Sequence, residues 1–338
     1  MWTGYTDHLR LMVDAMGAIG VHCLIRPTHH AEHLQGRHHP VPGFIKSKIV
    51  LEQQPEPWEL LLSPAHTRPS HGKKTVYFTM WETSKLPKEY VENLNMAEVV
   101  VVPGEWNRQV FRASGVTRPI HVCNLGADLS NFQQVDPPSF GPLIFGCAGR
   151  LSHGGERKGV NEVIRLFLKT FKDTTDVRLN VKCFQDDPLD KSLIDDPRIS
   201  VEQRYLSDRQ FANWISGVHV FVSLAKGEGW GMIQHQAMVI GRPVITPLWG
   251  GVSEFMDPSI CMPVEHTLEE PPKGNFYHGH GHWASPSEVM ASHAMISCQI
   301  HRDQLQPLGL MAAAAARKLN HHAANRALWK VLKKYGAL

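Results

Sequence analysis

The chain has 338 residues, of which 42% are hydrophobic and 20% are charged, and its formal net charge is +3. This composition is typical of a soluble globular enzyme, and the length allows two domains with full cores. The small positive charge neither requires nor excludes a polyanionic partner. The six cysteines are scattered without close pairs, which favours reduced thiols and a cytoplasmic protein over a disulfide framework. We expect no signal peptide and no membrane insertion, because no apolar run reaches the required length.

The first residues predict a turn at Gly4 and then a helical pattern over residues 5–16. Residues 27–47 form a loop rich in histidine. His29 and His33 lie four residues apart and could supply two metal ligands, but no cysteine or carboxylate set completes a metal site. We therefore interpret this segment as a polar loop rather than a metal centre.

Strands and helices alternate along the rest of the first 140 residues. We expect strands at residues 21–25, 48–52, 75–80, 98–102 and 121–128, an apolar segment at 58–62, and helices at 89–96 and 104–113. Such alternation is typical of a parallel sheet. The proline-rich residues 137–142 are the expected linker to a second domain.

The second half of the chain begins with a strand at Leu143, followed by a turn that carries Arg150 and Lys158 and by a helix that ends at Phe171. Another strand is expected at residues 178–184. From Met311 to the end of the chain we expect a single helix, first rich in alanine and then basic.

Residues 263–287 read as a loop rich in histidine, glycine and proline. Its alternating histidines, His278, His280 and His282, could in principle ligate a metal. We interpret them instead as part of a satisfied polar loop, so that no metal site is predicted in the chain.

The most informative stretch runs from residue 218 to residue 254. A strand rich in β-branched residues is followed by a glycine cluster and a helix, and a second strand at residues 243–247 ends in Gly250 and Gly251. Backbone N–H groups and a helix N-terminus in such a turn can face an anion. Two such loops at one edge of a parallel sheet are where α/β proteins bind phosphorylated ligands.

This stretch resembles the donor-binding signature of family 4 of the retaining GT-B glycosyltransferases. The matching residues are Glu228, Gly229, Trp230, Gly231, Ala237, Met238, Gly241, Pro243, Val244, Ile245, Gly250, Gly251 and Glu254. One position departs, because Gln236 stands where the family has a glutamate that holds the ribose hydroxyls. A glutamine can still accept a hydrogen bond there, but without a charge. Segments of the first 128 residues resemble a soluble subgroup of the same enzymes.

The resemblance implies an α/β protein with the GT-B fold, in which two Rossmann-like domains face a central cleft. Residues 1–140 would form the acceptor-side domain and residues 141–318 the donor-binding domain, with residues 319–338 as a helix that crosses back to the first domain. The implied activity is transfer of a sugar, with retention at the anomeric carbon, from a nucleotide-diphosphate donor to a hydroxyl acceptor. UDP is the expected carrier, because it is the most frequent one in the family.

The resemblance also assigns site residues. The expected catalytic residues are Glu228, Arg150 and Lys158, and the expected donor-binding residues are Gly4, Arg150, Lys158, Glu228, Gly229, Trp230, Gly231, Gln236, Gly250 and Gly251. The two cations and the glycine amides would stabilise the leaving diphosphate, while Glu228 would hold sugar hydroxyls. No metal or cofactor beyond the donor is expected, because the cations neutralise the diphosphate. Trp81 and Glu82 are the acceptor-side candidates.

Two alternatives remain open at this point. The acceptor could be a saccharide or small molecule, or it could be double-stranded DNA with hydroxymethylated bases, as in phage-type enzymes. Residues 304–338 carry six Lys and Arg and no Asp or Glu, and residues 66–88 are also basic, which would suit a DNA acceptor, although either patch alone is better explained as a solvated face. A different class of function is a catalytically silent scaffold that binds a sugar nucleotide or a partner protein, which Gln236 would suit.

Overall fold

The computed structural model describes residues 12, 23–27, 47–51, 58–64, 67–151 and 155–337. Gly4, the helix expected at residues 5–16, and His29 and His33 lie outside the described residues. The described chain divides into two compact units. One contains residues 129–318, and the other contains residues up to 128 together with residues 319–338.

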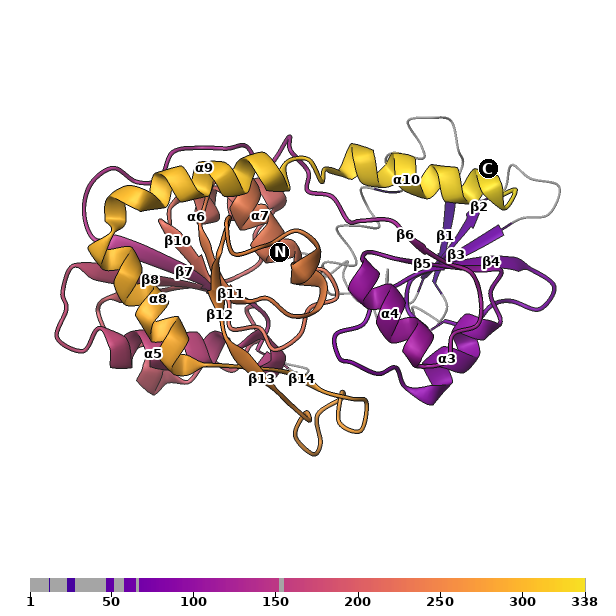
Figure 1. Ribbon diagram of the computed structural model, residues 1–338, viewed down its shortest axis with the longest axis horizontal. Coiled ribbons are helices and arrows are strands. Elements are labelled where there is room, and N and C mark those ends of the chain that lie inside the picture. The colour runs from indigo at the N-terminus through magenta and orange to yellow at the C-terminus, as the bar shows by residue number, and fades with distance from the viewer. Residues whose placement is uncertain are drawn as a thin grey trace. The chain divides into compact units, whose positions relative to one another are not determined.

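The larger unit is built on a parallel sheet with the strand order β12-β11-β10-β7-β8-β9. Its strands are β7 (Leu143–Ala148), β8 (Val177–Cys183), β9 (Ile199–Gln203), β10 (Val220–Val222), β11 (Val244–Pro247) and β12 (Met262–Val264). Its helices are α5 (Val160–Thr170), α6 (Asp208–Ser216), α7 (Met232–Ile240), α8 (Glu288–Ile300) and α9 (Leu305–Ala316). Helices cover both faces of this sheet, with α5 beside α8 on one face and α6, α7 and α9 on the other (Figure 1). The prediction of a parallel Rossmann-like sheet is confirmed for this unit.

Aromatic packing holds α5 against the sheet. The rings of Phe145 on β7 and Phe171 after α5 stack with their centroids 5.5 Å apart, and Phe167 contacts both. All three side chains are at most 1% exposed. Burying an aromatic side chain contributes about 1.5–3 kcal/mol relative to leaving it in water. This cluster holds the C-terminal end of α5 against the sheet.

The smaller unit has a mixed sheet with the order β1-β2-β3-β4-β5-β6. Its elements are β1 (Cys23–Pro27), β2 (Ser47–Leu51), β3 (Trp58–Leu61), β4 (Lys74–Phe78), α3 (Lys88–Asn95), β5 (Val99–Val102), α4 (Glu105–Ala113), β6 (Ile120–Val122) and α10 (His321–Lys334). Strands β3 to β6 are parallel, but β1 pairs with β2, and β2 with β3, in antiparallel orientation. The prediction of a parallel sheet is therefore wrong for β1 and β2. That prediction rests on strands that alternate with helices, and among the described residues no helix lies between β1 and β2.

Residues 129–140 pack with the larger unit, although the sequence analysis assigns them to the first domain. The anchor is Arg242, whose Nη1 donates to Val135 O at 2.9 Å and whose Nη2 donates to Asp136 O at 3.2 Å. Val135 N also donates to Ile240 O at 3.1 Å. Arg242 is fully buried, and burial lowers its pKa to about 10, with Asp136 acting in the opposite direction. A buried guanidinium needs these carbonyl acceptors, which is why the boundary lies nearer residue 128.

The C-terminal segment is two helices rather than the single helix predicted from Met311. The chain leaves α9 after Ala316 and re-enters a helix at His321, where the Asn320 side chain accepts a hydrogen bond from Ala323 N at 3.1 Å. Residues 319–321 pair with the turn at Ala127, whose N–H donates to Leu319 O at 3.2 Å. A Cβ on Gly126 would lie 2.1 Å from the Asn320 carbonyl carbon, so only glycine allows this approach. These contacts group residues 319–338 with the smaller unit.

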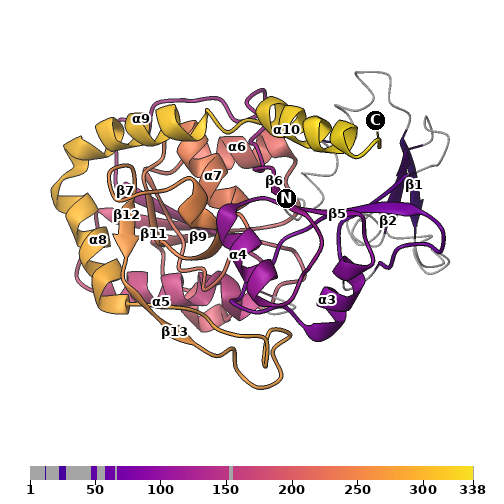
Figure 2. The same cartoon turned by 45° about the vertical axis from the view of Figure 1, so that its right-hand side comes forward.

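The segment at residues 263–287 is also more ordered than the predicted loop. It contains β12 and then an antiparallel hairpin of β13 (His266–Glu269) and β14 (Trp283–Pro286). The hairpin extends away from the sheet of the larger unit (Figure 2). Its strands are only four residues long, and the thirteen-residue connection conceals them in a sequence rich in glycine and histidine.

Candidate active site

The predicted donor-site residues of the larger unit gather at the carboxyl edge of its parallel sheet. Arg150 follows β7, Glu228 follows β10, and Gly250 follows β11. These three strands are adjacent in the sheet, in the order β11-β10-β7. The carboxyl edge of an open parallel sheet is the usual place for a ligand, so this is the candidate site.

Glu228 lies between two cations at this edge. Lys158 Nζ lies 2.6 Å from Glu228 Oε1, and Arg157 Nη1 lies 3.3 Å from Glu228 Oε2. Arg157 Nη1 also donates a short hydrogen bond to Gly227 O. The Glu228 side chain is 11% exposed and those of Arg157 and Lys158 are 13% and 21% exposed. The cluster is therefore largely withdrawn from water, where charge pairs interact more strongly.

The charge state of Glu228 follows from these contacts. Burial by itself would raise the pKa of the carboxyl, but Lys158 and Arg157 outweigh burial and hold the pKa below its usual range. Glu228 is thus an anion at neutral pH, in direct contact with Lys158 and Arg157. Arg157 was not among the predicted site residues, although it precedes Lys158 directly in the sequence.

Two glycines allow the backbones of the loops after β10 and β11 to approach each other closely. A Cβ on Gly251 would lie 2.2 Å from Gly229 O, and a Cβ on Gly250 would lie 2.8 Å from Glu228 O. Gly250 also has φ of +78°, which favours glycine. The Gly251 amide donates to Glu228 O at 2.7 Å. This bond occupies the amide that the sequence analysis assigns to the leaving phosphate, so Gly251 holds the Glu228 loop in place instead.

Glycines also begin the two helices nearest the site. Gly231 is the N-cap of α7 with φ of +94°, and Gly159 is the N-cap of α5 with φ of +65°. A Cβ on Gly159 would lie 2.4 Å from Leu224 O, so the turn before α5 touches the backbone after β10. Both helices therefore start at the same sheet edge, with their positive dipole ends toward the candidate site.

Arg150 has different partners from Lys158. Its Nη2 lies 2.9 Å from Asp186 Oδ2, its Nε lies 3.9 Å from Asp187 Oδ1, and its guanidinium stacks on the Phe184 ring at 4.7 Å. These residues follow β8, the next strand in the sheet. Arg150 thus pairs with carboxylates that follow β8, and Lys158 pairs with Glu228, which follows β10 on the other side of β7.

Trp230 is a core residue, although the sequence analysis places it among the donor-binding residues. Its side chain is 1% exposed, and its ring packs on Phe255 at 4.9 Å. Trp230 Nε1 donates to His235 Nδ1 at 3.4 Å, and His235 Nε2 lies 3.0 Å from Ala316 O. Burial lowers the pKa of His235 to about 4, so the imidazole is neutral with its proton on Nε2. His235 thus joins α7 to α9, and Trp230 donates to this histidine from the glycine loop.

Gln236 and Gln234 both lie on α7, and both are buried, at 6% and 2% exposure. Gln234 Nε2 donates to Ser223 Oγ at 2.9 Å, which ties the helix to the end of β10. Gln236 lies in the second turn of α7. Its role at a ribose stays a prediction.

Comparison with known proteins identifies this part of the chain. Residues 142–267 match the family model described as Glycosyl transferases group 1. These residues are similar to a group 1 glycosyltransferase domain. The match contains Arg150, Arg157, Lys158, Glu228, Gly250 and Gly251, and it confirms the predicted resemblance for this domain. Comparison with curated protein sequences gives no match.

Solved structures with the GT-B fold resemble most of the chain. TarM is 14% identical with a TM-score of 0.58, over 82% of this chain and 54% of TarM. Sucrose-phosphate synthase from Thermosynechococcus elongatus is 14% identical with a TM-score of 0.60, over 78% of this chain and 68% of the synthase. The pneumococcal O-GlcNAc transferase GtfA is 12% identical with a TM-score of 0.53, over 77% of this chain and 52% of GtfA. The predicted GT-B fold is confirmed, and the chain spans about half the length of TarM and GtfA.

The β13–β14 hairpin lies almost entirely beyond the matched part of the group 1 domain and contacts its cluster of charges. The guanidinium of Arg157 lies over the Tyr277 ring at 5.6 Å, and Asn275 Nδ2 donates to Glu156 Oε2 at 3.3 Å. Tyr277 is 8% exposed. These contacts were not predicted, because nothing in the composition of the loop indicates that it folds back onto residues 156 and 157.

The acceptor-side candidates belong to the smaller unit. Trp81 is 3% exposed, and its Nε1 donates to Thr83 Oγ1 at 2.6 Å and to Lys85 O at 2.8 Å. Its ring packs edge-on against Tyr90 at 5.1 Å. Trp81 therefore stabilises its own loop against α3, in contrast to the predicted role at an acceptor. Glu82 is half-buried and remains a candidate.

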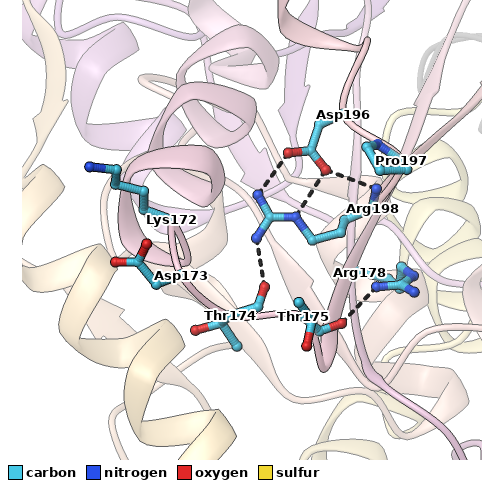
Figure 3. Close-up of a pocket in the computed structure, with 8 residues that line it drawn as sticks. All are labelled: Lys172, Asp173, Thr174, Thr175, Arg178, Asp196, Pro197 and Arg198. Carbon is cyan, nitrogen blue, oxygen red and sulfur yellow. Dashed lines mark hydrogen bonds and ion pairs between the residues drawn. The ribbon is translucent and has the colours of Figure 1, made fainter.

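A pocket of about 460 Å³ lies at the opposite, amino edge of the same sheet (Figure 3). Arg198 lines this pocket and donates to both oxygens of Asp196, with Nη2 2.7 Å from Asp196 Oδ2. Arg198 Nη1 also donates to Phe171 O and to Thr174 O. The arginine therefore holds the start of β9 against the end of α5, and we interpret the pocket as structural.

Three further findings concern metal ions, cysteines and membrane-spanning helices. Among residues 67–151 and 155–337, no group of three or more His, Cys, Asp and Glu side chains could hold a metal ion. The cysteines Cys123, Cys147, Cys183, Cys261 and Cys298 are buried free thiols. No helix in the described part of the chain combines the length and the apolar character that crossing a membrane requires.

Proposed function

We propose that the chain transfers a sugar from a nucleotide-diphosphate donor to a hydroxyl acceptor. The observation that carries this proposal is Glu228 between Lys158 and Arg157 at the carboxyl edge of a group 1 glycosyltransferase domain. The site offers cations and two helix N-termini for a diphosphate, and a carboxylate for sugar hydroxyls. That combination matches the charges of a nucleotide sugar.

The reaction breaks the bond between the anomeric carbon and the β-phosphate oxygen, and forms a bond from that carbon to the acceptor oxygen. Negative charge grows on the leaving diphosphate, where Lys158 and Arg157 stabilise it, with Arg150 on the other side of the β7 loop. Positive charge grows on the sugar ring, where Glu228 lends negative potential. The acceptor proton passes to the departing phosphate oxygen, so the step needs no separate base.

Retention at the anomeric carbon and UDP as the carrier are part of the proposal. No side chain in the described cluster acts as a dedicated nucleophile, which suits attack from the face that the phosphate leaves. Trehalose-6-phosphate synthase, a neighbour with 9% identity and a TM-score of 0.58, is described as transferring a sugar with retention. Structures of S. aureus TarM and of GtfA contain UDP. These neighbours support a UDP-sugar without deciding which sugar it carries.

Donor binding is tested first, by thermal shift with a panel of nucleotide sugars and with UDP. A ligand that binds only the native state stabilises it and so raises the melting temperature. At a ligand concentration of one hundred times Kd, the stabilisation is about 2.7 kcal/mol. Hydrolysis and transfer of the best donor are then measured with Lys158→Met and, as a matched control, Lys169→Met. Lys169 lies on α5 with a 76% exposed side chain, paired with Glu288.

We expect Lys158→Met to abolish hydrolysis and Lys169→Met to preserve it. Donor binding without hydrolysis or transfer would leave the silent scaffold as the function. No stabilisation by any nucleotide sugar would refute the donor proposal itself. Gln236→Glu should keep activity and tighten donor binding, because a charged acceptor holds ribose hydroxyls more strongly than an amide.

A nucleic-acid acceptor is the second candidate, and one observation on α10 favours it. The exposed face of this helix carries Arg326, Lys330, Lys333 and Lys334, while its apolar residues Leu328 and Leu332 are buried. Residues 304–338 contain no Asp or Glu. A basic helix without exposed large apolar side chains suits a polyanion in solution better than a membrane surface.

Duplex DNA binding tests this candidate as a function of salt. The triple change of Arg326, Lys330 and Lys334 to Gln should remove binding and lower the salt slope, because each neutralised phosphate contributes about 0.9 to it. The matched control changes Arg165, Lys169 and Lys172 to Gln, which are exposed at similar spacing around α5. No DNA binding at low salt, or equal loss in both variants, would rule the nucleic-acid acceptor out.

A further inference from the structure

The β13–β14 hairpin is joined to the loop that carries Glu228. Ala284 N donates to Lys226 O at 2.7 Å, and Lys226 Nζ lies 2.8 Å from Glu269 Oε1. Trp283 Nε1 donates to the same Glu269 oxygen at 3.0 Å, and Trp283 is fully buried. The two strands of the hairpin are thus both fixed to Lys226, two residues before Glu228.

The same loop is joined to the turn at Gly155–Lys158. Lys226 N donates to Arg157 O at 2.7 Å. The Arg157 side chain returns to the loop through Gly227 O and Glu228 Oε2. Arg157 therefore contacts the Glu228 loop through both its backbone and its guanidinium. The orientation of the guanidinium sets its distance from the Glu228 carboxylate.

The connection of the hairpin covers this guanidinium. Tyr277 places its ring at 5.6 Å from Arg157 Cζ, within the range at which an aromatic face attracts a cation. The Tyr277 ring also lies near Trp283 at 6.3 Å, so it is supported from the base of the hairpin. Asn275, two residues earlier, donates to Glu156 Oε2 at 3.3 Å and holds the connection beside residue 157.

We propose that Tyr277 is a positioning residue for the Arg157–Glu228 pair, and this proposal rests on the sugar-transfer function proposed above. The ring covers one face of the guanidinium and restricts its rotation, while Gly227 O and Glu228 accept its hydrogen bonds. With the ring in place, Arg157 keeps Glu228 ionised and fixed between two cations. Without it, Arg157 gains rotational freedom and solvent, and its hold on Glu228 weakens.

The test compares three variants in the hairpin. Tyr277→Leu removes the aromatic face and keeps apolar bulk, and Tyr277→Phe keeps the face and removes only the hydroxyl. Leu268→Ala is the control, because Leu268 lies on β13 of the same hairpin and is 54% exposed. For each variant we would measure kcat and donor KM for donor hydrolysis between pH 4 and 8, and the melting temperature without ligand.

We expect Tyr277→Leu to lower kcat about tenfold, as the loss of one partly buried cation–π contact would. The acid limb of the pH profile of kcat should move to higher pH in this variant, because Glu228 is then held less firmly as an anion. Tyr277→Phe and Leu268→Ala should keep the wild-type pH profile. A purely structural role would lower the melting temperature of Tyr277→Leu and leave the acid limb in place, and that outcome overturns the proposal. An equal defect in Tyr277→Phe overturns it as well, since the hydroxyl would then be the active group.

A double-mutant cycle separates this proposal from the proposed function. The free energies of unfolding of Arg157→Met, Tyr277→Leu and the double variant need neither donor nor turnover. Non-additive losses support the contact, and additive losses overturn it. If wild-type protein binds no nucleotide sugar, the proposed function and the positioning role fall together. If wild-type protein is active and Tyr277→Leu matches it in kcat and pH profile, only the positioning role falls.

Discussion

Lys158 Nζ and Glu228 Oε1 lie 2.6 Å apart, although the two residues are separated by 70 positions in the sequence. Each was expected to contact a different part of the donor, the cation at the diphosphate and the carboxylate at the sugar. The ion pair adds a link between the two roles. In the proposed function, a donor that binds here exchanges part of this contact for its own phosphate oxygens, while Arg157 continues to hold Glu228.

Removing Lys158 should reduce turnover more than any other single change in the cation set. Lys158→Ala leaves Glu228 with one cation fewer and the diphosphate without its nearest ammonium, so we expect kcat to fall about 10²–10³-fold. Arg150→Ala should also reduce kcat, but less, because Asp186 and Asp187 already share its charge. Steady-state kinetics with circular dichroism as a folding check measure this. Near-normal turnover in Lys158→Ala would contradict the assignment.

The stability of the protein should depend on Glu228 in acid. Its pKa is lower in the folded protein than the ordinary value of 4.5, because Lys158 and Arg157 outweigh the effect of burial. The resulting stability is present above pH 4.5 and is lost as the pH falls through the lower folded value. Urea unfolding of the wild type and of Glu228→Gln at pH 7 and pH 3.5 checks this. The difference between the two proteins should shrink at pH 3.5, and an unchanged difference would argue against an ionised Glu228.

Stability should also change between pH 6.5 and pH 4 because of His235. Burial lowers its folded pKa from 6.5 to about 4, so protonation favours the unfolded chain. Stability is then complete above pH 6.5 and decreases as the pH falls toward 4, by up to about 3 kcal/mol. His235→Gln should flatten this part of the profile, whereas His293→Gln, at an exposed position of α8, should not. The slope that remains belongs partly to His219, whose pKa burial also lowers to about 4.

Gly251→Ala should destabilise the larger unit. A Cβ atom on residue 251 would lie 2.2 Å from Gly229 O. The atoms that it would meet belong to the backbone, which leaves little room for adjustment. We expect a loss of about 2 kcal/mol or more, together with loss of activity, since the Glu228 loop must move. Gly217→Ala is the control, because its φ is −79° and its nearest contact is 3.4 Å. Thermal melts compare the two, and equal melting temperatures would show that the loops do not need this approach.

Activity should survive removal of divalent metal ions. The proposed site neutralises the diphosphate with Lys158, Arg157 and Arg150, so no metal is needed for that task. Turnover measured with and without EDTA should agree within error. A loss that one particular divalent ion restores would show that a metal takes part, and the histidines His278, His280 and His282 would then be the first ligands to replace.

The sequence by itself determined much of the local structure and the chemistry of the candidate site. The β-branched run before residue 223 predicted β10, and the glycine cluster and the apolar residues from Met232 predicted the loop and α7. These signals are local, since hydrophobic period and glycine depend on neighbours a few residues away. The family resemblance at positions 150, 158 and 228 then led to the prediction of a diphosphate and a sugar as ligands, before any contact was known.

The tertiary structure decided which of these residues meet. Arg157 joined Glu228, Arg150 joined Asp186, Trp230 and Trp81 became core residues, and Tyr277 reached the site from a hairpin more than a hundred residues further along the chain. Arg242, which lies far from the linker in sequence, binds the linker backbone and so holds residues 129–140 against the larger unit. Such partners depend on the order of strands in a sheet and on how closely two backbones approach. Both are set by packing over the whole unit, and no short stretch of residues contains them.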